Sequence, residues 1–281
     1  MTGATGTTGS RVAARLAALG HTARPTSRGA RPGHVRFDWY DPGTHAPALR
    51  GADRAYLVPP LAEPDPAAVM APFLERARAA GVRRVVLLSS SAVPQGGPGV
   101  GRVHQLLAEG GLFEEWTVLR PSWFMQNFTG DHVHARAIRD DGVLTTATGA
   151  GRVAFVDADD IAAVAAHALT DPRAPGGDLV VTGPEALSYA DVADVVTRVT
   201  GRAVSHRPVP PGELAARLAA SGMPAAFAGF LAGLDAAIGR GAEDRVTDTV
   251  ERITGRAPRA FAEMYAARYA SPRSTATEPS R

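Results

Sequence analysis

Two hydrophobic patterns alternate through the first two-thirds of the chain: short β-branched runs and Ala-rich amphipathic stretches. The runs predict strands over residues 34–38, 54–58, 84–89, 117–120 and 178–182. The amphipathic stretches predict helices over residues 10–19, 67–80, 100–109 and 158–169. Strands that alternate with helices of this length predict an α/β fold, a doubly wound parallel sheet of the Rossmann type with helices on both faces.

The pattern becomes mostly helical from about Tyr189. It predicts helices over residues 189–200, 212–221, 225–238, 246–254 and 259–269. Ser188 and Asp191 have the spacing of a capping box that opens the first of these helices. We therefore expect a Rossmann core over residues 1–185, a smaller, mostly helical lobe that covers the substrate over 186–270, and a disordered tail over 271–281.

Composition narrows the partners of the chain. It has 281 residues without cysteine, and 30 basic residues stand against 28 acidic ones for a net charge of +2. We find no basic run that would track nucleic acid, no apolar run near the ~20 residues of a membrane helix, and no signal peptide. The expectation is a cytoplasmic protein, monomer or homodimer, that binds a small molecule and neither nucleic acid nor membrane.

A glycine-rich loop opens the chain, reading Thr-Gly-Ala-Thr-Gly-Thr-Thr-Gly-Ser over residues 2–10. Its first glycine permits a tight turn, the second lets backbone approach a pyrophosphate, and the third lets the following helix pack on its strand. The N-terminus of that helix offers free N–H groups and the positive end of its dipole. The residues expected to contact a dinucleotide here are Gly3, Thr5, Gly6, Thr7, Thr8 and Gly9.

A Rossmann fold needs a buried strand before this loop, yet only Met1 precedes Thr2. Losing that strand would expose the hydrogen-bonding edges of its neighbours. Either the first strand is truncated or the true start lies upstream. We favour the second interpretation, which mass spectrometry of the native protein would test.

The segment after the first helix indicates which dinucleotide is bound. NAD enzymes of this class carry an acidic residue there for the ribose 2′-hydroxyl, but residues 22–28 contain none. Arg28 is placed to hold a 2′-phosphate, with a hydrogen bond from Ser27 and Arg31 as a helper. The sequence therefore favours NADP(H), and the alternative interpretation of Arg28 is a solvated loop arginine.

Two later segments carry a family resemblance. Residues 81–91 (Gly-Val-Arg-Arg-Val-Val-Leu-Leu-Ser-Ser-Ser) and 117–128 (Thr-Val-Leu-Arg-Pro-Ser-Trp-Phe-Met-Gln-Asn-Phe) resemble the NmrA-like branch of the atypical short-chain dehydrogenases. Within it the chain is most similar to the fungal ergot-alkaloid dehydrogenases. The resemblance implies an NADPH-dependent reductase of a carbon–nitrogen double bond, which in the alkaloid dehydrogenases belongs to a cyclic iminium.

The reducing chemistry has to do without the usual acid. Ordinary short-chain dehydrogenases protonate an alkoxide with a Tyr-x-x-x-Lys pair, and this chain offers no lysine for that role. An iminium substrate removes the need, because a cation that accepts hydride becomes a neutral amine. The protein then has only to position the two reactants in a dry pocket.

The carboxyl ends of the predicted strands are where ligands bind in this fold. The residues expected on the cofactor there are Asp38, Val58, Pro59, Ser89, Ser90 and Pro121. Asp38 would meet the adenine amino group or simply cap its strand, and the serines would approach the nicotinamide ribose or only bond to one another.

Trp123, Phe124 and Met125 would wall the nicotinamide and a flat substrate, with Asn127 beside them. Aromatic faces also stabilise a nearby cation, by about 0.5–2 kcal/mol. The alternative interpretation is that these side chains pack the core of the lobe and that Asn127 caps the turn after the strand.

The histidines give weaker signals. His104 is the one candidate acid or base, on the helix where ordinary members carry Tyr-x-x-x-Lys, although a surface or capping role is the alternative. The spacing of His132 and His134 invites a metal interpretation, which we reject because no third ligand is patterned with them, so no metal is expected.

Three functions therefore remain open from the sequence. The first is an NADPH-dependent imine or iminium reductase. The second is a reductase of a quinone or conjugated alkene, which also needs no Tyr-Lys pair. The third is a regulator of the NmrA kind that senses NADP without turnover.

Overall fold

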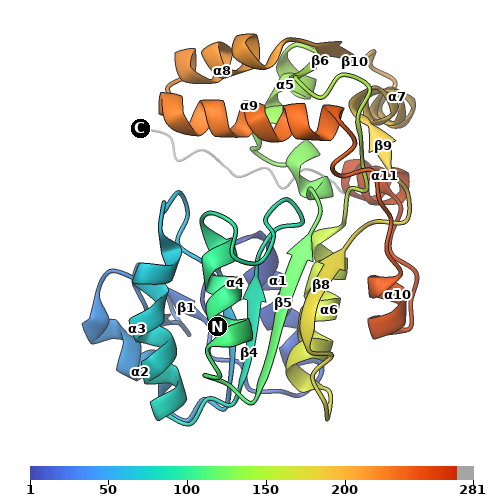
Figure 1. Cartoon of the computed structure of the whole chain (residues 1–281). Coiled ribbons are helices and arrows are strands. Elements are labelled where there is room, and N and C mark those ends of the chain that lie inside the picture. Colours follow the sequence, from blue (N-terminus) through green and yellow to red (C-terminus); the bar gives the residue numbers. More distant parts are fainter. Residues whose placement is uncertain (271–281) are drawn as a thin grey trace, which may run out of the picture.

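The core of the protein is a parallel sheet with helices on both faces (Figure 1). The computed structural model describes residues 1–270, so the predicted disordered tail, 271–281, lies outside the described residues. Four parallel strands pair in the order β3 (Arg54–Leu57), β4 (Arg84–Leu88), β5 (Glu115–Pro121) and β8 (Gly177–Val181). Beside them lies a parallel ribbon of β1 (Thr26–Ser27) and β2 (Val35–Arg36). The predicted α/β fold class is confirmed.

Met1 and Thr2 join the ribbon to the four-stranded sheet. The amide of Thr26 donates to the Met1 carbonyl at 3.1 Å, and the amide of Thr2 donates to the Tyr56 carbonyl at 3.0 Å. The two residues therefore hold the place of a strand between β1 and β3. They also bring the glycine loop to the carboxyl end of β3, where the Thr2 hydroxyl accepts the Val58 amide at 2.7 Å.

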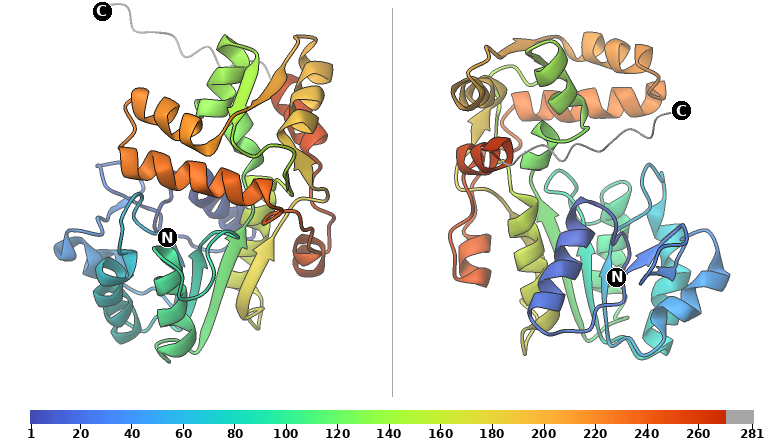
Figure 2. Two further views of the ribbon diagram at one scale, coloured as in Figure 1. Left: turned by 45° about the horizontal axis from the view of Figure 1, so that its top comes forward. Right: turned by 180° about the vertical axis from the view of Figure 1, so that it is seen from behind.

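The sheet is buried on both faces, as the unbroken apolar strands predict. Tyr56, Val86 and Leu119 pack against α1 (Thr7–Ala18) and α6 (Ala158–Thr170). The residues beside them in sequence, such as Leu57 and Val85, point to the opposite face. The helices that cover that face are α2 (His45–Leu49), α3 (Pro66–Ala79) and α4 (Val100–Glu109). Figure 2 shows α1 and α6 from behind.

Most predicted boundaries fall within a few residues of the observed ones. The helix 100–109 is observed unchanged as α4, whereas α1 begins at Thr7, three residues earlier than predicted. Strand β1 was obscured by Pro25, because proline is disfavoured in strands, and only two residues pair there. The short turn η1 (Pro42–Thr44), which leads into α2, was not predicted either.

A lobe of helices and short strands stands over the carboxyl ends of the core strands (Figures 1 and 2). Its elements are η2 (Met125–Phe128), α5 (Val133–Asp140), β6 (Val143–Thr146), β7 (Arg152–Val153), β9 (Leu187–Ser188), α7 (Tyr189–Thr200), β10 (Ser205–Pro208), α8 (Pro211–Ala220), α9 (Ala225–Gly239) and α11 (Phe261–Ala270). Strand β10 pairs in parallel with β6, and β7 pairs antiparallel with β9. None of the helices in residues 1–270 is long and apolar enough to cross a membrane.

The lobe draws on both sides of the expected division at residue 185. Its core joins Met125 and Phe155, which precede that point, to Tyr189 and Phe261, which follow it. In the other direction, α10 (Thr249–Thr254) returns to the Rossmann core, where Val250 packs with the residues of α6. The chain thus passes between the two parts several times, and this ties the lobe to the sheet.

Histidines pack among the aromatic side chains of the lobe. His134, on α5, stacks on Phe128 with ring centroids 5.5 Å apart and meets Tyr189 edge-on at 5.4 Å. Burial lowers the pKa of His134, and the nearby His132 and His206 lower it further. His134 is therefore neutral in the folded protein around pH 7.

We predict that His134→Phe makes the protein more resistant to acid. As pH falls below the ordinary histidine pKa of about 6.5, the unfolded chain takes up a proton that folded His134 resists. Wild-type stability is therefore lost on acidification, by at most about 1.4 kcal/mol per pH unit from this residue. Urea unfolding between pH 7.5 and 5 should show the variant losing less stability than the wild type. The matched control is the exposed His21→Asn, and parallel curves for wild type and His134→Phe would contradict the prediction.

Candidate functional site

The glycine loop is held by contacts that leave no space for side chains. Gly3 has a φ of +61°, and a Cβ there would lie 2.8 Å from the Val58 side chain. A Cβ on Gly9 would lie 2.2 Å from the carbonyl oxygen of Gly3. The first and third glycines thus let the loop and α1 pack closely on the end of β3, as the motif predicts.

Gly6 is the N-cap of α1 and has an extended backbone, with φ −86° and ψ 179°. No side chain caps this helix end, and its first turn has no acidic residue. Thr5, Gly6 and Thr7 are exposed. The free N–H groups and the positive end of the helix dipole therefore face outward, an arrangement suited to a phosphate.

A cleft of about 540 Å³ opens in front of this helix end. Ten of the predicted cofactor residues line it: Gly3, Thr5, Gly6, Thr7, Thr8, Ser27, Arg28, Asp38, Val58 and Pro59. Gly9 is buried behind the loop. The remaining lining includes residues that sequence analysis missed: Thr2, Thr26, Phe37, Trp39, Tyr40, Pro60, Leu61 and Leu88. The cleft is continuous from the glycine loop to the ends of β1 and β3.

An arginine stands at the β1 end of the cleft. Arg28 is exposed, and no hydrogen bond or ion pair within residues 1–270 engages its guanidinium. The Ser27 hydroxyl donates to the Gly29 carbonyl at 2.7 Å, which shapes the loop beside it. A free guanidinium with no carboxylate after β1 suits a 2′-phosphate and not a bare ribose hydroxyl.

Aromatic residues after β2 complete this end of the cleft. The Trp39 indole N–H donates to the Val58 carbonyl at 3.2 Å, and the Tyr40 hydroxyl donates to Glu63 at 2.7 Å. Asp38 lines the cleft, while its Oδ1 accepts the Tyr40 amide at 3.0 Å. Asp38 is thus a local cap that also faces the cleft, and its contact with an adenine amino group stays a prediction.

The other predicted strand-end residues lie beyond the cleft lining, at the carboxyl ends of β4 and β5. Ser89 has a buried hydroxyl with no hydrogen-bond partner in the described part of the chain. The Ser90 hydroxyl accepts the Ala92 amide at 3.3 Å. Pro121 is buried and pairs with Val181 of β8. Their contact with a cofactor stays a prediction.

The predicted substrate wall divides between the cleft and the lobe. Phe124 lines the cleft. Met125 is 1% exposed in the core of the lobe, and Trp123 packs against that core. Asn127 is half-buried. Its backbone N–H donates to the Phe124 carbonyl at 3.0 Å, which helps form the turn. Phe124 is therefore the wall residue best placed to meet ligands.

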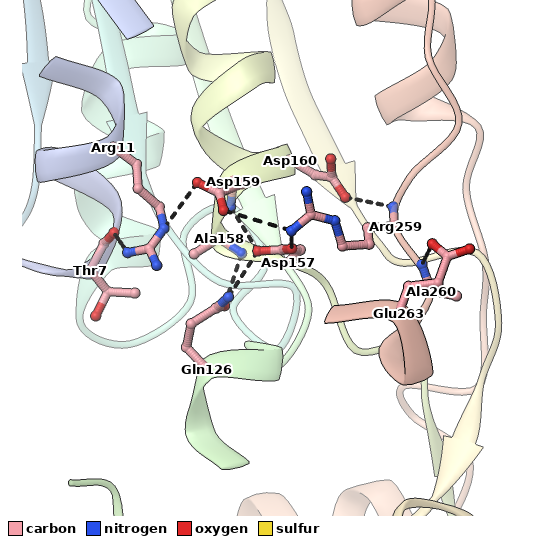
Figure 3. Close-up of polar contacts among 10 residues, drawn as sticks. All are labelled: Thr7, Arg11, Gln126, Asp157, Ala158, Asp159, Asp160, Arg259, Ala260 and Glu263. Carbon is pink, nitrogen blue, oxygen red and sulfur yellow. Dashed lines mark hydrogen bonds and ion pairs between the residues drawn. The ribbon is translucent and has the colours of Figure 1, made fainter. Parts of the chain in front are cut away.

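A polar network fixes this wall (Figure 3). Gln126 donates to Asp157 Oδ1 at 2.8 Å and accepts the Ala158 amide at 2.9 Å, so it binds the N-terminus of α6. Arg259 reaches Asp157 Oδ2 at 2.9 Å. Arg11 of α1 pairs with Asp159 at 3.1 Å. The network thus connects the wall, the C-terminal segment and the helix of the glycine loop.

The histidines of the sequence analysis lie away from the cleft. His104 is 1% exposed on α4, its ring 6.1 Å from that of Trp116, and its Nδ1 has no partner among the described residues. Its acid–base role stays a prediction. His132 caps α5, its Nδ1 accepting the His134 amide at 3.2 Å.

Comparison with known proteins identifies the family. The model of the NmrA-like family matches residues 112–266, more than half of the chain. The chain belongs to the NmrA-like family. The oxidoreductase YesF of Bacillus subtilis is 46% identical over 271 residues, 95% of this chain and 93% of that protein. Agroclavine dehydrogenase of Claviceps fusiformis is 40% identical over 241 residues, 82% of each chain, so the resemblance to the ergot-alkaloid group is confirmed.

The fold is also that of a solved reductase. The NADPH complex of the quinone oxidoreductase QOR2 from Escherichia coli matches with a TM-score of 0.76 at 24% identity. The match covers 95% of this chain and 98% of that one. The Rossmann core and the lobe above it are thus a shared architecture.

We predict that alanine at one glycine of the loop weakens cofactor binding, whereas alanine at another lowers the stability of the fold. Gly6→Ala should fold normally, because its Cβ would approach Gly3 no closer than 3.4 Å, but should bind NADPH at least about tenfold more weakly by blocking the phosphates. Gly9→Ala should lower the free energy of unfolding by about 1–3 kcal/mol or more, because backbone must move.

Thermal unfolding and NADPH fluorescence titration measure the two effects. Gly212→Ala on α8 is the control, since nothing lies within 4 Å of its Cβ position. Wild-type NADPH affinity in Gly6→Ala would show that the phosphates do not meet this helix end.

We predict that Arg28→Ala weakens NADPH binding by about tenfold, the loss of one charge-assisted contact, and changes NADH binding little. Parallel titrations with the two cofactors measure the difference. Arg83→Ala, at an exposed arginine just before the amino end of β4, is the control. An equal loss for both cofactors would remove Arg28 from the 2′-phosphate.

Proposed function

We propose that the protein, an NADP(H)-dependent oxidoreductase of the NmrA-like family, delivers hydride to the carbon of an imine or iminium group in a small, secondary-metabolite-like substrate. The observation that carries the proposal is that all 30 basic residues are arginine, so no Tyr-Lys pair exists anywhere in the sequence. A substrate that is already cationic needs no such acid. The 40% identity to agroclavine dehydrogenase supports the same class of acceptor.

The tyrosines agree with this assignment. Tyr40 is the only tyrosine among the described cleft residues, and its hydroxyl is engaged by Glu63. Tyr56 is fully buried beneath the sheet surface, and burial raises its pKa well above the ordinary value. A phenol with a raised pKa is a poor proton donor near neutral pH.

The cleft suits the cofactor at each of its parts. The N–H groups after Gly6 would hold the pyrophosphate, Arg28 the 2′-phosphate, and Phe124 one wall beside the nicotinamide. When bound, NADPH supplies the hydride. The work left to the chain is to orient the acceptor and exclude water.

Helix α9 supplies an apolar surface for that acceptor. It is the lobe helix that faces the core across the carboxyl ends of the strands (Figures 1 and 2). Ala228 and Ala232 are buried, while Phe227 and Phe230 are 39% and 50% exposed, with stacked rings 6.2 Å apart. The one charged residue of the helix, Asp235, accepts the Ala147 amide at 2.9 Å. An apolar, aromatic face suits a flat polycyclic cation.

The test is NADPH oxidation with a polycyclic N-methyl iminium salt. We expect turnover, and with NADPH deuterated at the nicotinamide C4 we expect one deuterium on the former iminium carbon of the amine product. Phe230→Ser should raise KM for this acceptor several-fold, because apolar contact is lost, whereas the exposed Leu19→Ser should not.

Two results would contradict the proposal, and they can be told apart. Turnover of a quinone without turnover of the iminium would make the protein a quinone reductase. Tight NADPH binding with no acceptor consumed would make it a sensor. Either result overturns the proposal.

A further inference from the structure

The side-chain carboxyl group of a buried glutamate contacts a serine just after the C-terminal end of strand β4. Glu243, in the segment between α9 and α10, is 3% exposed, and its Oε2 accepts the Ser91 hydroxyl at 2.7 Å. Ser91 is 4% exposed and follows β4, 152 residues away in the sequence. The lobe thus delivers an acidic group to the end of a core strand, and nothing in the proposed hydride transfer to a cation uses it.

The surroundings of Glu243 hold Ser91 firmly. Arg120 of β5 and Arg245 both donate to the Ser91 carbonyl, at 3.0 and 3.2 Å. Arg120 is also paired with Asp178 of β8 at 2.6 Å, which offsets its charge. Burial raises the pKa of Glu243, and this outweighs the Ser91 hydrogen bond and the two arginines, which lower it. The carboxyl group therefore keeps its proton to higher pH than an ordinary glutamate.

Ser91 stands close along the chain to two residues of the cleft. It follows Leu88, which lines the cleft, by three residues, and its backbone amide donates at 2.9 Å to the carbonyl of Pro121, three residues before the cleft residue Phe124. Two further hydroxyls at this edge, Ser89 and Ser122, are buried without a partner within residues 1–270. A buried hydroxyl without a protein partner is costly, so each of these two can bind a water molecule or a polar ligand atom.

We propose that Glu243 supplies a proton through the Ser91 hydroxyl to neutral acceptors, so that the enzyme reduces neutral imines as well as iminium cations. The inference rests on the proposed function. Hydride from NADPH adds to the imine carbon, which forms a C–H bond and leaves NADP⁺. The Ser91 hydroxyl first turns from Glu243 toward the imine nitrogen, so that its oxygen accepts from the protonated carboxyl group. The π electron pair moves to nitrogen, which takes the Ser91 proton, and Ser91 takes that of Glu243. Solvent then reprotonates the carboxylate. Glu243 acts through Ser91 and is a positioning and proton-supplying residue.

The experiment compares a cyclic imine with its N-methyl iminium salt over a pH series. Wild-type kcat for the imine should fall as pH rises through the pKa of Glu243, whereas the iminium profile should lack this step. Glu243→Gln should abolish the step and lower the ratio of imine to iminium kcat by about a hundredfold. Ser91→Ala should lower the ratio likewise, and Ser91→Thr, which keeps a hydroxyl, should restore most of it. Glu114→Gln, an exposed glutamate, is the control.

An infrared measurement checks the same group without turnover. The wild type should show the C=O stretch of a protonated carboxyl group that is lost as pH rises through the pKa of Glu243, and Glu243→Gln should lack it. Absence of this band, or equal losses of kcat for both substrates in Glu243→Gln, would overturn the relay. If the wild type reduces neither substrate, the proposed function fails. The infrared band still shows whether Glu243 carries a proton, so the two failures can be told apart.

Discussion

The close packing of the glycine loop on the end of β3 is the constraint on which the site depends. Gly3 touches Val58 and Gly9 touches the Gly3 carbonyl so closely that neither position has space for a Cβ. This contact sets where α1 begins, and with it the direction in which the first N–H groups point. Because Met1 and Thr2 are hydrogen-bonded to both β1 and β3, the same contact also fixes the arginine loop after β1 relative to the glycine-loop end of the cleft. The two features that we propose for the pyrophosphate and the 2′-phosphate are thus placed by one piece of backbone packing.

A second set of contacts makes the lobe part of the same unit. Asp157 is buried between Gln126 of the wall and Arg259 of the C-terminal segment. Isolated surface ion pairs contribute little, but a carboxylate with three donors at a helix start is well satisfied and geometrically defined. The Asp159–Arg11 pair extends this order to the helix that begins at the glycine loop. A wall that carries Phe124 is therefore positioned relative to the cofactor loop and not merely near it.

Local sequence patterns predicted what depends on local physics. The glycine loop, the two-sided burial of β3, β4 and β5, and the capping box at Ser188 follow from residue spacing, and all are observed. The pairing of β6 with β10 could not be predicted in this way, because Thr146 and Pro208 are partners that only the folded lobe brings together. Trp39 and Tyr40 were missed for a related reason. They follow a strand of only two residues, too short for its period to show that the next side chains turn into a cleft.

The chemistry of the site follows the same division between local and distant residues. The residues that would hold a cofactor come mostly from one stretch of chain, residues 2–60, and they form a motif because a dinucleotide imposes fixed spacings. Groups that handle an acceptor face no such common demand, since acceptors differ in shape and charge. They can come from any element of the lobe or the core, and in our proposals they are Phe230 of α9 and Glu243 of the segment that follows it. The absence of lysine shows only that the usual acid is missing. Whether a different proton donor replaces the Tyr-Lys pair depends on which buried carboxyl group the lobe places beside the end of β4. That placement is a property of the folded chain and not of a motif.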